Sequence, residues 1–470
     1  MTYSGPAEDK FAAVLSDIGL RAADIRSTLR LDGTPPVLNS PHQVALAGGI
    51  ALLAQGAAVC ALWEQRGGRP QQVALDARDP VFALNPFPWL RRNDHVAINL
   101  AQAREPCGGY FATADGGHVF VTTPSARQRD RLLRLLGTPN DHAAVAAAIG
   151  KYDGAEIEDA FIREGLPGSL VRDAAEWQRL PHGIAVAGEP VIRVERVGDS
   201  DPEPLGPGAR PLDGVRVADL THVVAGPTVS RYLAEQGADV LHLGPIHPKL
   251  IDHTGMTLET NMGKRSAIVD FEDDGAQVLA VLLREADVFV QAWRPGMLLS
   301  RGFGPAEVAA ARPGIIYVSV SCYGPAGPWA NRAGYDPVAL ASTGVTADEA
   351  RHDKFKNAPP GVLTDGYAGF LGAAAVASAL ARRAVEGGSW HISISLVRLA
   401  TWLQEFGQYP GGTPEGPSPG APRTRRMESP FGTLDYVAPA LRYSETVSYF
   451  DKPPVPVGAS RPEWLPARRP

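Results

Sequence analysis

Three consecutive residues, Thr364-Asp365-Gly366, stand at the start of a stretch rich in alanine and glycine that the sequence predicts to be a helix over 366–385. The helix dipole and the free N–H groups of a first turn keep an aspartate at this position ionised. An ionised carboxylate can act as a nucleophile in covalent catalysis. Position alone favours a simpler interpretation, in which Asp365 only caps the helix.

Histidines and cysteines offer no second centre of reactivity. The histidines have no spacing typical of metal ligands, so we expect no metal site. The cysteines are scattered without a CxxC pair, which fits a reducing, cytoplasmic environment better than a disulfide framework. The histidines considered are His42, His118 and His182, and the cysteines are Cys60, Cys107 and Cys322.

Composition excludes several classes of protein. The 470 residues carry a net charge of −6, which argues against a general nucleic-acid binder. The first ten residues are polar and acidic, unlike a signal peptide. The uncharged stretch from Val44 to Trp63 is long enough to span a bilayer, yet half of it is alanine and glycine. We therefore expect a tightly packed core helix there, no membrane span, and a cytoplasmic protein.

Strand and helix patterns alternate after a linker rich in proline, glycine and acidic residues at 199–211. This alternation predicts an α/β fold, in which a Rossmann-like parallel sheet has helices on both faces. No GxGxxG follows the first strand, so a dinucleotide fingerprint is absent. The expected strands are 215–219, 239–243, 266–270, 287–291 and 315–321, and the expected helices are 228–236, 275–285 and 305–311.

The residues before the linker predict a helical lead-in at 1–36, an alanine-rich helix at 40–66 and a smaller α+β region. A hairpin is expected over 108–123, because two alternating runs flank Asp115-Gly116. Helical patterns follow at 125–136 and 155–179. One pattern occurs twice, at 40–76 and again from 366: a helix of small residues, then a Gly-Gly turn, then a strand. The tail from 408 predicts an extended wrapping segment or partial disorder.

Five ordered segments resemble the family III CoA-transferases, also called the CaiB/BaiF family. They include the strand Asn261-Met262-Gly263-Lys264-Arg265-Ser266 and the segment that ends in Gly334-Tyr335-Asp336. Residues 108–197 resemble the small domain of the family, which there follows the sheet half and here precedes it. The five segments are 211–240, 261–271, 286–304, 312–344 and 364–383.

The resemblance implies a rearranged order of domains, produced by a tandem fusion or by circular permutation. The first part resembles the second part of the family's large domain, and the sheet part carries the CoA site and the catalytic aspartate. The implied parts are 1–105 as a helical segment, 106–198 as the small α+β domain, 199–211 as the linker, 212–400 as the large domain and 401–470 as the C-terminal wrapping segment.

The implied activity is transfer of coenzyme A between carboxylic acids through an aspartyl intermediate. Asp365 matches the nucleophile of the family, and Gly366 would leave room for a thioester to approach. Asp336 matches an acidic position near that nucleophile. The racemases of the family carry histidine where this chain has Tyr335, and tyrosine is a poor proton-transfer group at neutral pH. We therefore favour a transferase over an α-methylacyl-CoA racemase.

The resemblance also implies where CoA binds. Residues after the first strand would line its site, a valine and a tryptophan would flank the adenine, and arginines would contact the phosphates. The implied contacts are Val223, Val224 and Ala225 for the loop, Val269 and Trp293 for the adenine, Arg294 and Arg301 for the phosphates, and Lys264 and Arg265 for additional positive charge.

A non-catalytic homologue that binds CoA, or that serves as a partner subunit, is the alternative from a different functional class. In either case the expected ligands are an acyl-CoA and a carboxylic acid, with no permanently bound cofactor. The family implies a homodimer, possibly with interlocked chains.

Overall fold

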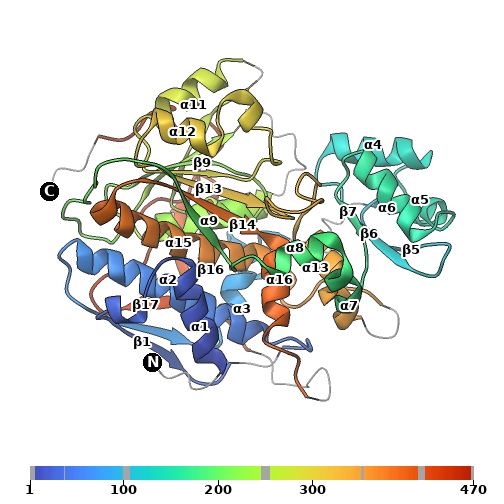
Figure 1. Ribbon diagram of the computed structural model, residues 1–470, viewed down its shortest axis with the longest axis horizontal. Helices are drawn as coiled ribbons and strands as arrows, with labels where there is room; N and C mark the ends of the chain where they lie inside the picture. The colour runs from blue at the N-terminus through green and yellow to red at the C-terminus, as the bar shows by residue number, and fades with distance from the viewer. Residues whose placement is uncertain are drawn as a thin grey trace.

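A seven-stranded sheet occupies the centre of the molecule. The structure is a computed structural model, and it describes residues 6–35, 38–98, 106–244, 254–271, 273–350, 354–410 and 419–466. The strand order of the sheet is β11-β10-β9-β12-β13-β14-β8, and every neighbouring pair is parallel except β14 with β8 (Figure 1). The strands are β8 (Arg193–Gly198), β9 (Arg216–Leu220), β10 (Asp239–Gly244), β11 (Lys264–Ile268), β12 (Val288–Gln291), β13 (Ile316–Ser321) and β14 (Ser389–Ser395).

Helices cover both faces of this sheet, as expected. On one face lie α11 (Gly275–Leu283) and α12 (Pro305–Ala311), and on the other lie α9 (Ala225–Glu235) and α15 (Thr364–Glu386) (Figure 1). The predicted Rossmann-like α/β fold is therefore confirmed. Strand order reverses between β9 and β12, and in such sheets ligands bind at the carboxyl ends of the strands near the reversal.

A further layer packs on α15 from the N-terminal part of the chain. Helix α2 (Val44–Gln65) lies along α15, and both helices are buried and rich in small residues. By length and composition alone, both could cross a membrane, but 89% and 83% of their most apolar windows are buried inside the molecule. This packing agrees with the expected core helix. Beyond α2 lie α1 (Pro6–Asp17) and a sheet of β1 (Thr28–Asp32), β2 (Gln72–Asp76) and β17 (Leu441–Tyr443).

A smaller lobe projects from one side of the molecule (Figure 1). It has a hydrophobic core of its own that runs from Cys107 to Leu166. The predicted hairpin is present as β5 and β6, which pair in antiparallel fashion. The lobe contains β5 (Gly109–Ala112), β6 (His118–Val121), β7 (Gly168–Leu170), α4 (Ala126–Leu136), α5 (His142–Ile149) and α6 (Gly154–Arg163).

Two expectations for this part of the chain differ from the structure. The single helix expected at 155–179 was wrong, because Gly165 with φ +61° ends α6 and leads into β7. The expected small domain extended to 198, but α7 (Ala174–Arg179), α8 (Pro181–Ala187) and β8 belong to the large part. Strand β8 pairs with β14 at the edge of the main sheet, and α8 contacts α16 (Leu396–Gln404).

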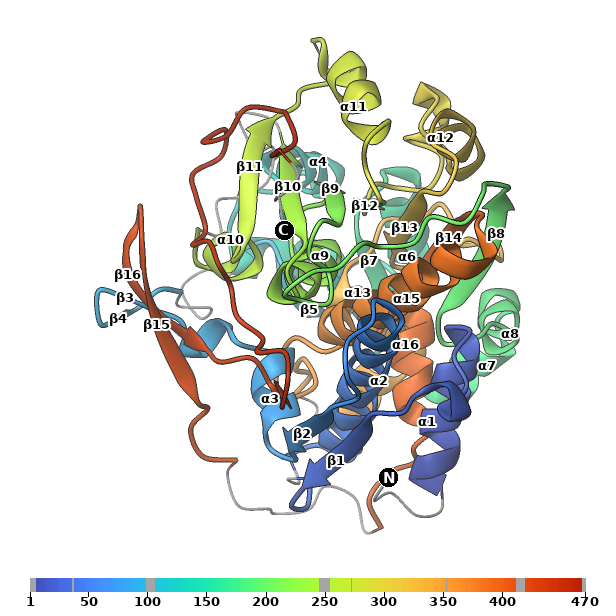
Figure 2. The same cartoon turned by 90° about the vertical axis from the view of Figure 1, so that its left-hand side faces the viewer.

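The tail is more regular than expected. Strands β15 (Thr424–Ser429) and β16 (Gly432–Val437) form a hairpin that joins β3 (Arg91–Arg92) and β4 (His95–Val96) in an extended sheet at the side of the molecule (Figure 2). Strand β15 is largely exposed and polar, so its sequence has the composition of a loop and did not indicate a strand. The following segment wraps the large part, as expected, since Arg265 donates to the carbonyl oxygen of Glu463.

Five shorter helices complete the described part of the chain. Several parts of the predicted first segment, 1–105, and last segment, 401–470, lie outside the described residues. The helices are α3 (Asp79–Leu84), α10 (Thr254–Thr260), α13 (Asp336–Thr343), α14 (Val345–Glu349) and the already mentioned α16, with 3₁₀ turns at Ala22–Asp24, Phe87–Trp89 and Leu299–Arg301. The undescribed parts of the two terminal segments are 1–5, 36–37, 99–105, 411–418 and 467–470.

Replacing Gly372 by alanine tests how closely α15 approaches α9 and the sheet. A β-carbon at this position would lie 2.7 Å from Val229 Cγ2 and 2.8 Å from Ile394 Cδ1, both in fully buried side chains. Alanine favours a helix interior by about 1 kcal/mol over glycine, but overpacking costs about 1–3 kcal/mol. We expect a net loss of about 1 kcal/mol in urea unfolding. An increase in stability would show that helix propensity outweighs this contact.

Candidate active site

Asp336, at the start of α13, caps the first turn of α15. Its Oδ1 accepts hydrogen bonds from Thr364 N at 2.5 Å, Thr364 Oγ1 at 2.5 Å, Leu363 N at 3.3 Å and Asp365 N at 3.4 Å. The N-cap residue of the helix, Leu363, has no side chain that could do so. Asp365 is therefore not the cap of its own helix, and the interpretation that position alone favoured was wrong.

The carboxyl group of Asp365 is buried in the first turn of α15. The residue is 8% exposed, and within the described residues no hydrogen bond reaches its carboxylate. Burial, followed by the nearby charge of Asp336, raises the pKa of Asp365 well above its usual range. The expectation that the start of the helix keeps this side chain ionised was therefore wrong, because a neighbouring carboxylate already uses the amides of that turn.

Asp336 is the member of the pair that carries negative charge more readily. Burial raises its pKa too, but the amides and the hydroxyl that it accepts from act in the opposite direction and stabilise its ionised form. Among the residues that the structure describes, none donates such a hydrogen bond to Asp365. In a pair of close carboxyl groups, the group with donors ionises first and its charge keeps the proton on the other. Of the two carboxyl groups, Asp365 is therefore the one on which a proton is favoured.

The surroundings of Asp365 come from both lobes. Cys322, after β13, is buried, and its thiol pKa is raised by burial and by the charges of Asp365 and Asp336. Tyr335 is also close to Asp365. Burial raises the pKa of the tyrosine, and the charge of Asp365 raises it further. Gln128 of α4 donates a hydrogen bond to Tyr335, which lowers the pKa of the tyrosine. The small lobe thus reaches the immediate neighbourhood of the two aspartates.

The loop after β9 lies beside the start of α15. Val223 has φ +71°, a conformation that β-branched residues rarely adopt and that clusters at functional sites. Val224 is buried and Ala225 begins α9. Val223 and Val224 pack with Phe87 from the N-terminal segment and with residues just before α15. The members of this cluster are Phe87, Ile98 and Val224, with Val223, Met256 and Val362 against them.

An aromatic group lies beyond the carboxyl ends of β11 and β12. The ring of Trp293 is 5.2 Å from that of Phe271, and the guanidinium of Arg301 lies 6.0 Å from the Trp293 ring. Val269 is buried beneath them, in the core between the sheet and α11. A planar ring beside a guanidinium group is suited to an adenine and a phosphate.

Three of the four basic side chains expected near CoA, one predicted phosphate contact and the two residues of additional positive charge, already have partners inside the protein. Lys264 is 1% exposed, and its Nζ lies 2.8 Å from Asp219 Oδ2. Arg265 pairs with Asp239 at 2.9 Å. Arg294 is exposed and donates to the carbonyl oxygen of Gly165 in the small lobe at 2.8 Å. These contacts give Lys264 and Arg265 structural roles and do not support phosphate binding by either.

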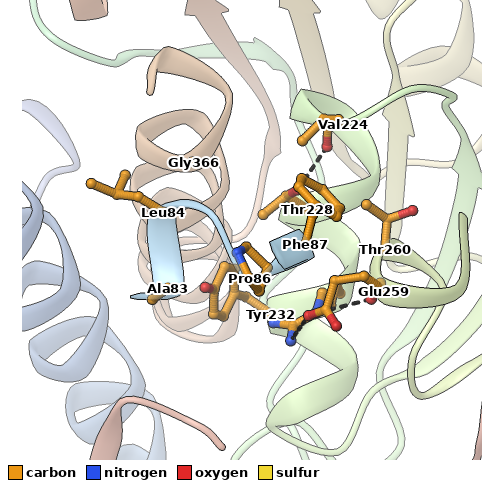
Figure 3. A pocket seen from close by; sticks show the side chains of 11 residues that line it. Ala83, Leu84, Pro86, Phe87, Val224, Thr228, Tyr232, Glu259, Thr260 and Gly366 are labelled. Atoms are coloured by element: carbon orange, nitrogen blue, oxygen red, sulfur yellow. Dashed lines mark hydrogen bonds and ion pairs between the residues drawn. The ribbon is translucent and has the colours of Figure 1, made fainter. Parts of the chain in front are cut away.

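Gly366 does not provide open space for a thioester, contrary to the expectation. A β-carbon there would lie 2.7 Å from Leu84 Cδ2 and 3.1 Å from Leu84 Cα, so the glycine accommodates α3. Beside this contact is a cavity of about 10 Å³ (Figure 3). Its lining residues are Ala83, Leu84, Pro86, Phe87, Val224, Thr228, Arg231, Tyr232, Glu259, Thr260 and Gly366.

Sequence reasoning missed the role of the N-terminal segment in this site. Residues 83–87 cover the start of α15, yet nothing in their types indicates chemistry. The repeated pattern of small-residue helix and Gly-Gly turn was the available signal, since it could have placed α2 beside α15. Among the described residues, no group of three or more His, Cys, Asp or Glu side chains could hold a metal ion.

Comparison with known proteins gives a consistent result. Residues 212–434 match the model of CoA-transferase family III. The chain is 30% identical over 369 residues to acetyl-coenzyme A transferase nodX of Hypoxylon pulicicidum, covering 71% of this chain and 61% of that protein. It is 32% identical over 201 residues to the succinyl-CoA:glutarate CoA-transferase of Mus musculus, covering 40% and 46%.

A solved structure of a CAIB/BAIF family protein from Brucella suis shares 30% identity, covers 42% of this chain and 55% of that chain, and has a TM-score of 0.38. The chain spans about three fifths of the length of the first relative and less than half of that of the second. The predicted resemblance is confirmed for the matched region, whereas the cause of the domain order stays a prediction.

The variant Asp365→Asn tests the electrostatics of the pair through stability. A raised pKa in the folded chain means that the protonated carboxyl contributes stability below the ordinary value of 3.8, and that this contribution is lost as pH rises through the raised pKa. Asparagine loses nothing over that range. We expect the variant to melt a few degrees higher than the wild type at pH 8 and at the same temperature below about pH 4. A lower melting temperature at pH 8 would contradict the assignment.

Proposed function

We propose, from the family III CoA-transferase region at residues 212–434, that this chain transfers coenzyme A between carboxylic acids with Asp365 as nucleophile. Relatives named as CoA-transferases for acetyl-CoA and for succinyl-CoA with glutarate support this class of reaction. The chain spans only part of those relatives, so the activity of the whole protein is part of the proposal. The donor is an acyl-CoA, the acceptor is a carboxylate, and no resident cofactor takes part.

The first half of the reaction exchanges a thioester for an anhydride. A carboxylate oxygen of Asp365 attacks the thioester carbonyl, the C–O bond forms, and the C–S bond breaks with CoA leaving as its thiolate. The thiolate then attacks the aspartyl carbonyl of the anhydride, which releases the first acid and leaves an aspartyl-CoA thioester. The acceptor carboxylate repeats the sequence in reverse. No net proton is taken up or released.

The observation that carries this proposal is the division of labour between the two aspartates. Asp336 accepts the hydrogen bonds of the first turn of α15, so the carboxyl group of Asp365 is not used in capping. Its burial excludes water that would hydrolyse an anhydride. The loop with the strained Val223 packs in one cluster with Val362, just before this helix start, and such strain is the kind of feature that active sites maintain.

The aromatic group at Trp293 and Arg301 is the proposed site for the adenine end of CoA. We propose that CoA crosses the loop after β9 on its way to Asp365, because a β-carbon at Gly226 would lie 3.1 Å from Ala292 Cβ, next to Trp293, and Val224 lines the cavity beside Gly366. Assembly as a homodimer and a cytoplasmic location stay predictions.

Trapping with hydroxylamine tests the nucleophile. We expect intact-mass spectrometry after incubation with a panel of acyl-CoAs to find a hydroxamate on Asp365 in the wild type. Asp365→Asn has nearly the same shape but no nucleophilic oxygen, so it should form no adduct and lose at least about 10³-fold in transfer rate.

An unchanged adduct in the variant would assign the nucleophile to another residue. No adduct with any acyl-CoA, together with no CoA binding by calorimetry, would instead indicate a protein without this activity.

The variant Asp336→Asn tests how the pair controls ionisation. Asparagine keeps an oxygen that accepts from the amides of α15, but it removes the negative charge that raises the pKa of Asp365. Because Asp365 must lose its proton to attack, activity should rise with pH through the raised pKa of that group. We expect the acidic limb of the kcat/KM profile to move to lower pH in the variant. A limb at the same pH would show that the charge of Asp336 does not reach the nucleophile.

A further inference from the structure

We propose that the cavity beside Gly366 is the acyl subsite, and that its size and walls restrict the donor to short acyl groups of about two or three carbons. The inference rests on the proposed function, since it places the acyl group of the same thioester that Asp365 attacks. It adds a residue, Phe87, that limits the length of the acyl chain. Phe87 lies in the N-terminal segment, outside the family match at 212–434.

The position of the cavity is the first argument. Gly366 is one of its walls and is the residue directly after Asp365 on α15. Val224, which follows the strained Val223, forms another wall. The cavity therefore lies between the start of α15 and the loop where the thioester end of CoA is proposed to reach. Figure 3 shows Pro86 and Phe87 between these two elements.

The size of the cavity is the second argument. A cavity of about 10 Å³ has room for a group the size of one water molecule. A methyl group attached to a carbonyl carbon on Asp365 is the tail nearest to that size. A longer chain would have to displace Leu84 or Phe87, whose relative exposures are 1% each and whose packing fixes them.

The floor of the cavity is the third argument, because it is charged and tightly paired. The guanidinium of Arg231 lies 2.5 Å from Glu259 Oε1, and the residues are 6% and 1% exposed. Glu259 Oε2 is buried and has no hydrogen-bond partner among the described residues. A long apolar tail would bring more apolar carbon against this unpaired carboxylate oxygen and would offer it no hydrogen bond, which is unfavourable. The floor therefore also favours a short tail.

Phe87 is the wall that a substitution can remove most simply. It belongs to a 3₁₀ turn, not to a helix or strand of the main sheet, and it packs with Val224 and Ile98. Replacing a buried phenylalanine by alanine leaves space that a ligand can fill. Leu84, in contrast, packs against Gly366 through both its Cδ2 and its backbone, so a substitution there would also disturb how α3 covers the start of α15.

The test measures kcat/KM for straight-chain acyl-CoA donors from acetyl to octanoyl in the wild type and in Phe87→Ala. We expect acetyl-CoA or propionyl-CoA to be preferred in the wild type. In Phe87→Ala the ratio of hexanoyl-CoA to acetyl-CoA should rise by about tenfold or more, since each methylene in an apolar pocket changes selectivity by about that factor.

Phe82→Ala is the matched control. Phe82 is also buried, at 3% exposure, and lies in α3, but its ring packs edge-on against Trp89 and it does not line the cavity. It should lose a comparable amount of stability without a change in chain-length preference. Phe87→Leu shortens the same wall by less and keeps a folded protein available, with a smaller shift in the same direction.

The outcomes separate this inference from the proposed function. A wild type that prefers hexanoyl-CoA or longer donors, or equal chain-length profiles in the wild type and both Phe87 variants, would overturn the acyl subsite while leaving Asp365 as nucleophile. The same shift in Phe82→Ala would also overturn it. Absence of any adduct on Asp365 with every donor would overturn the proposed function itself.

Discussion

The hydrogen bonds from the first turn of α15 to Asp336 are the interaction on which the site depends. A helix start has free N–H groups that need acceptors, and burial makes this need costly to leave unmet. Here the acceptor comes from a different helix, α13, so one carboxylate both ties the two helices together and satisfies the turn. The next carboxylate along the chain, that of Asp365, is buried and accepts no hydrogen bond from the described residues. The proposed nucleophile is thus available because its neighbour meets the structural requirement.

The rest of the fold keeps that helix start in position. Small residues along α15 let α9, α2 and the strand β14 approach closely, and bulkier residues at those contacts would displace the helix from the loop after β9. The N-terminal segment then covers the same helix start through Leu84 and Phe87. Parts of the chain that are about 280 residues apart in sequence thus form opposite walls of one small site.

Much of this arrangement could be predicted from the sequence, for identifiable reasons. The strands of the main sheet are apolar runs separated by short turns, and such local patterns locate strands and helices well. Asp365 and Asp336 could be named because ordered motifs surround them. The hydrogen bonds of these two residues could not be predicted, because the position of α13 relative to α15 decides which carboxylate caps α15. Lys264 illustrates the same limit, since a lysine within a basic motif turned out to be buried against Asp219. The position of Leu84 against Gly366 likewise depends on tertiary packing between segments far apart in the chain.

The most direct test of the account follows an oxygen atom through the reaction. An acceptor acid labelled with ¹⁸O in its carboxylate is used with the donor that the wild type accepts. When the acceptor attacks an aspartyl-CoA thioester, one labelled oxygen bridges the anhydride, and the return of CoA to the acceptor carbonyl leaves that oxygen on the enzyme. We predict that the peptide containing Asp365 gains ¹⁸O and that the peptide containing Asp336 does not. Transfer of CoA without any label in the Asp365 peptide would contradict covalent catalysis by this residue.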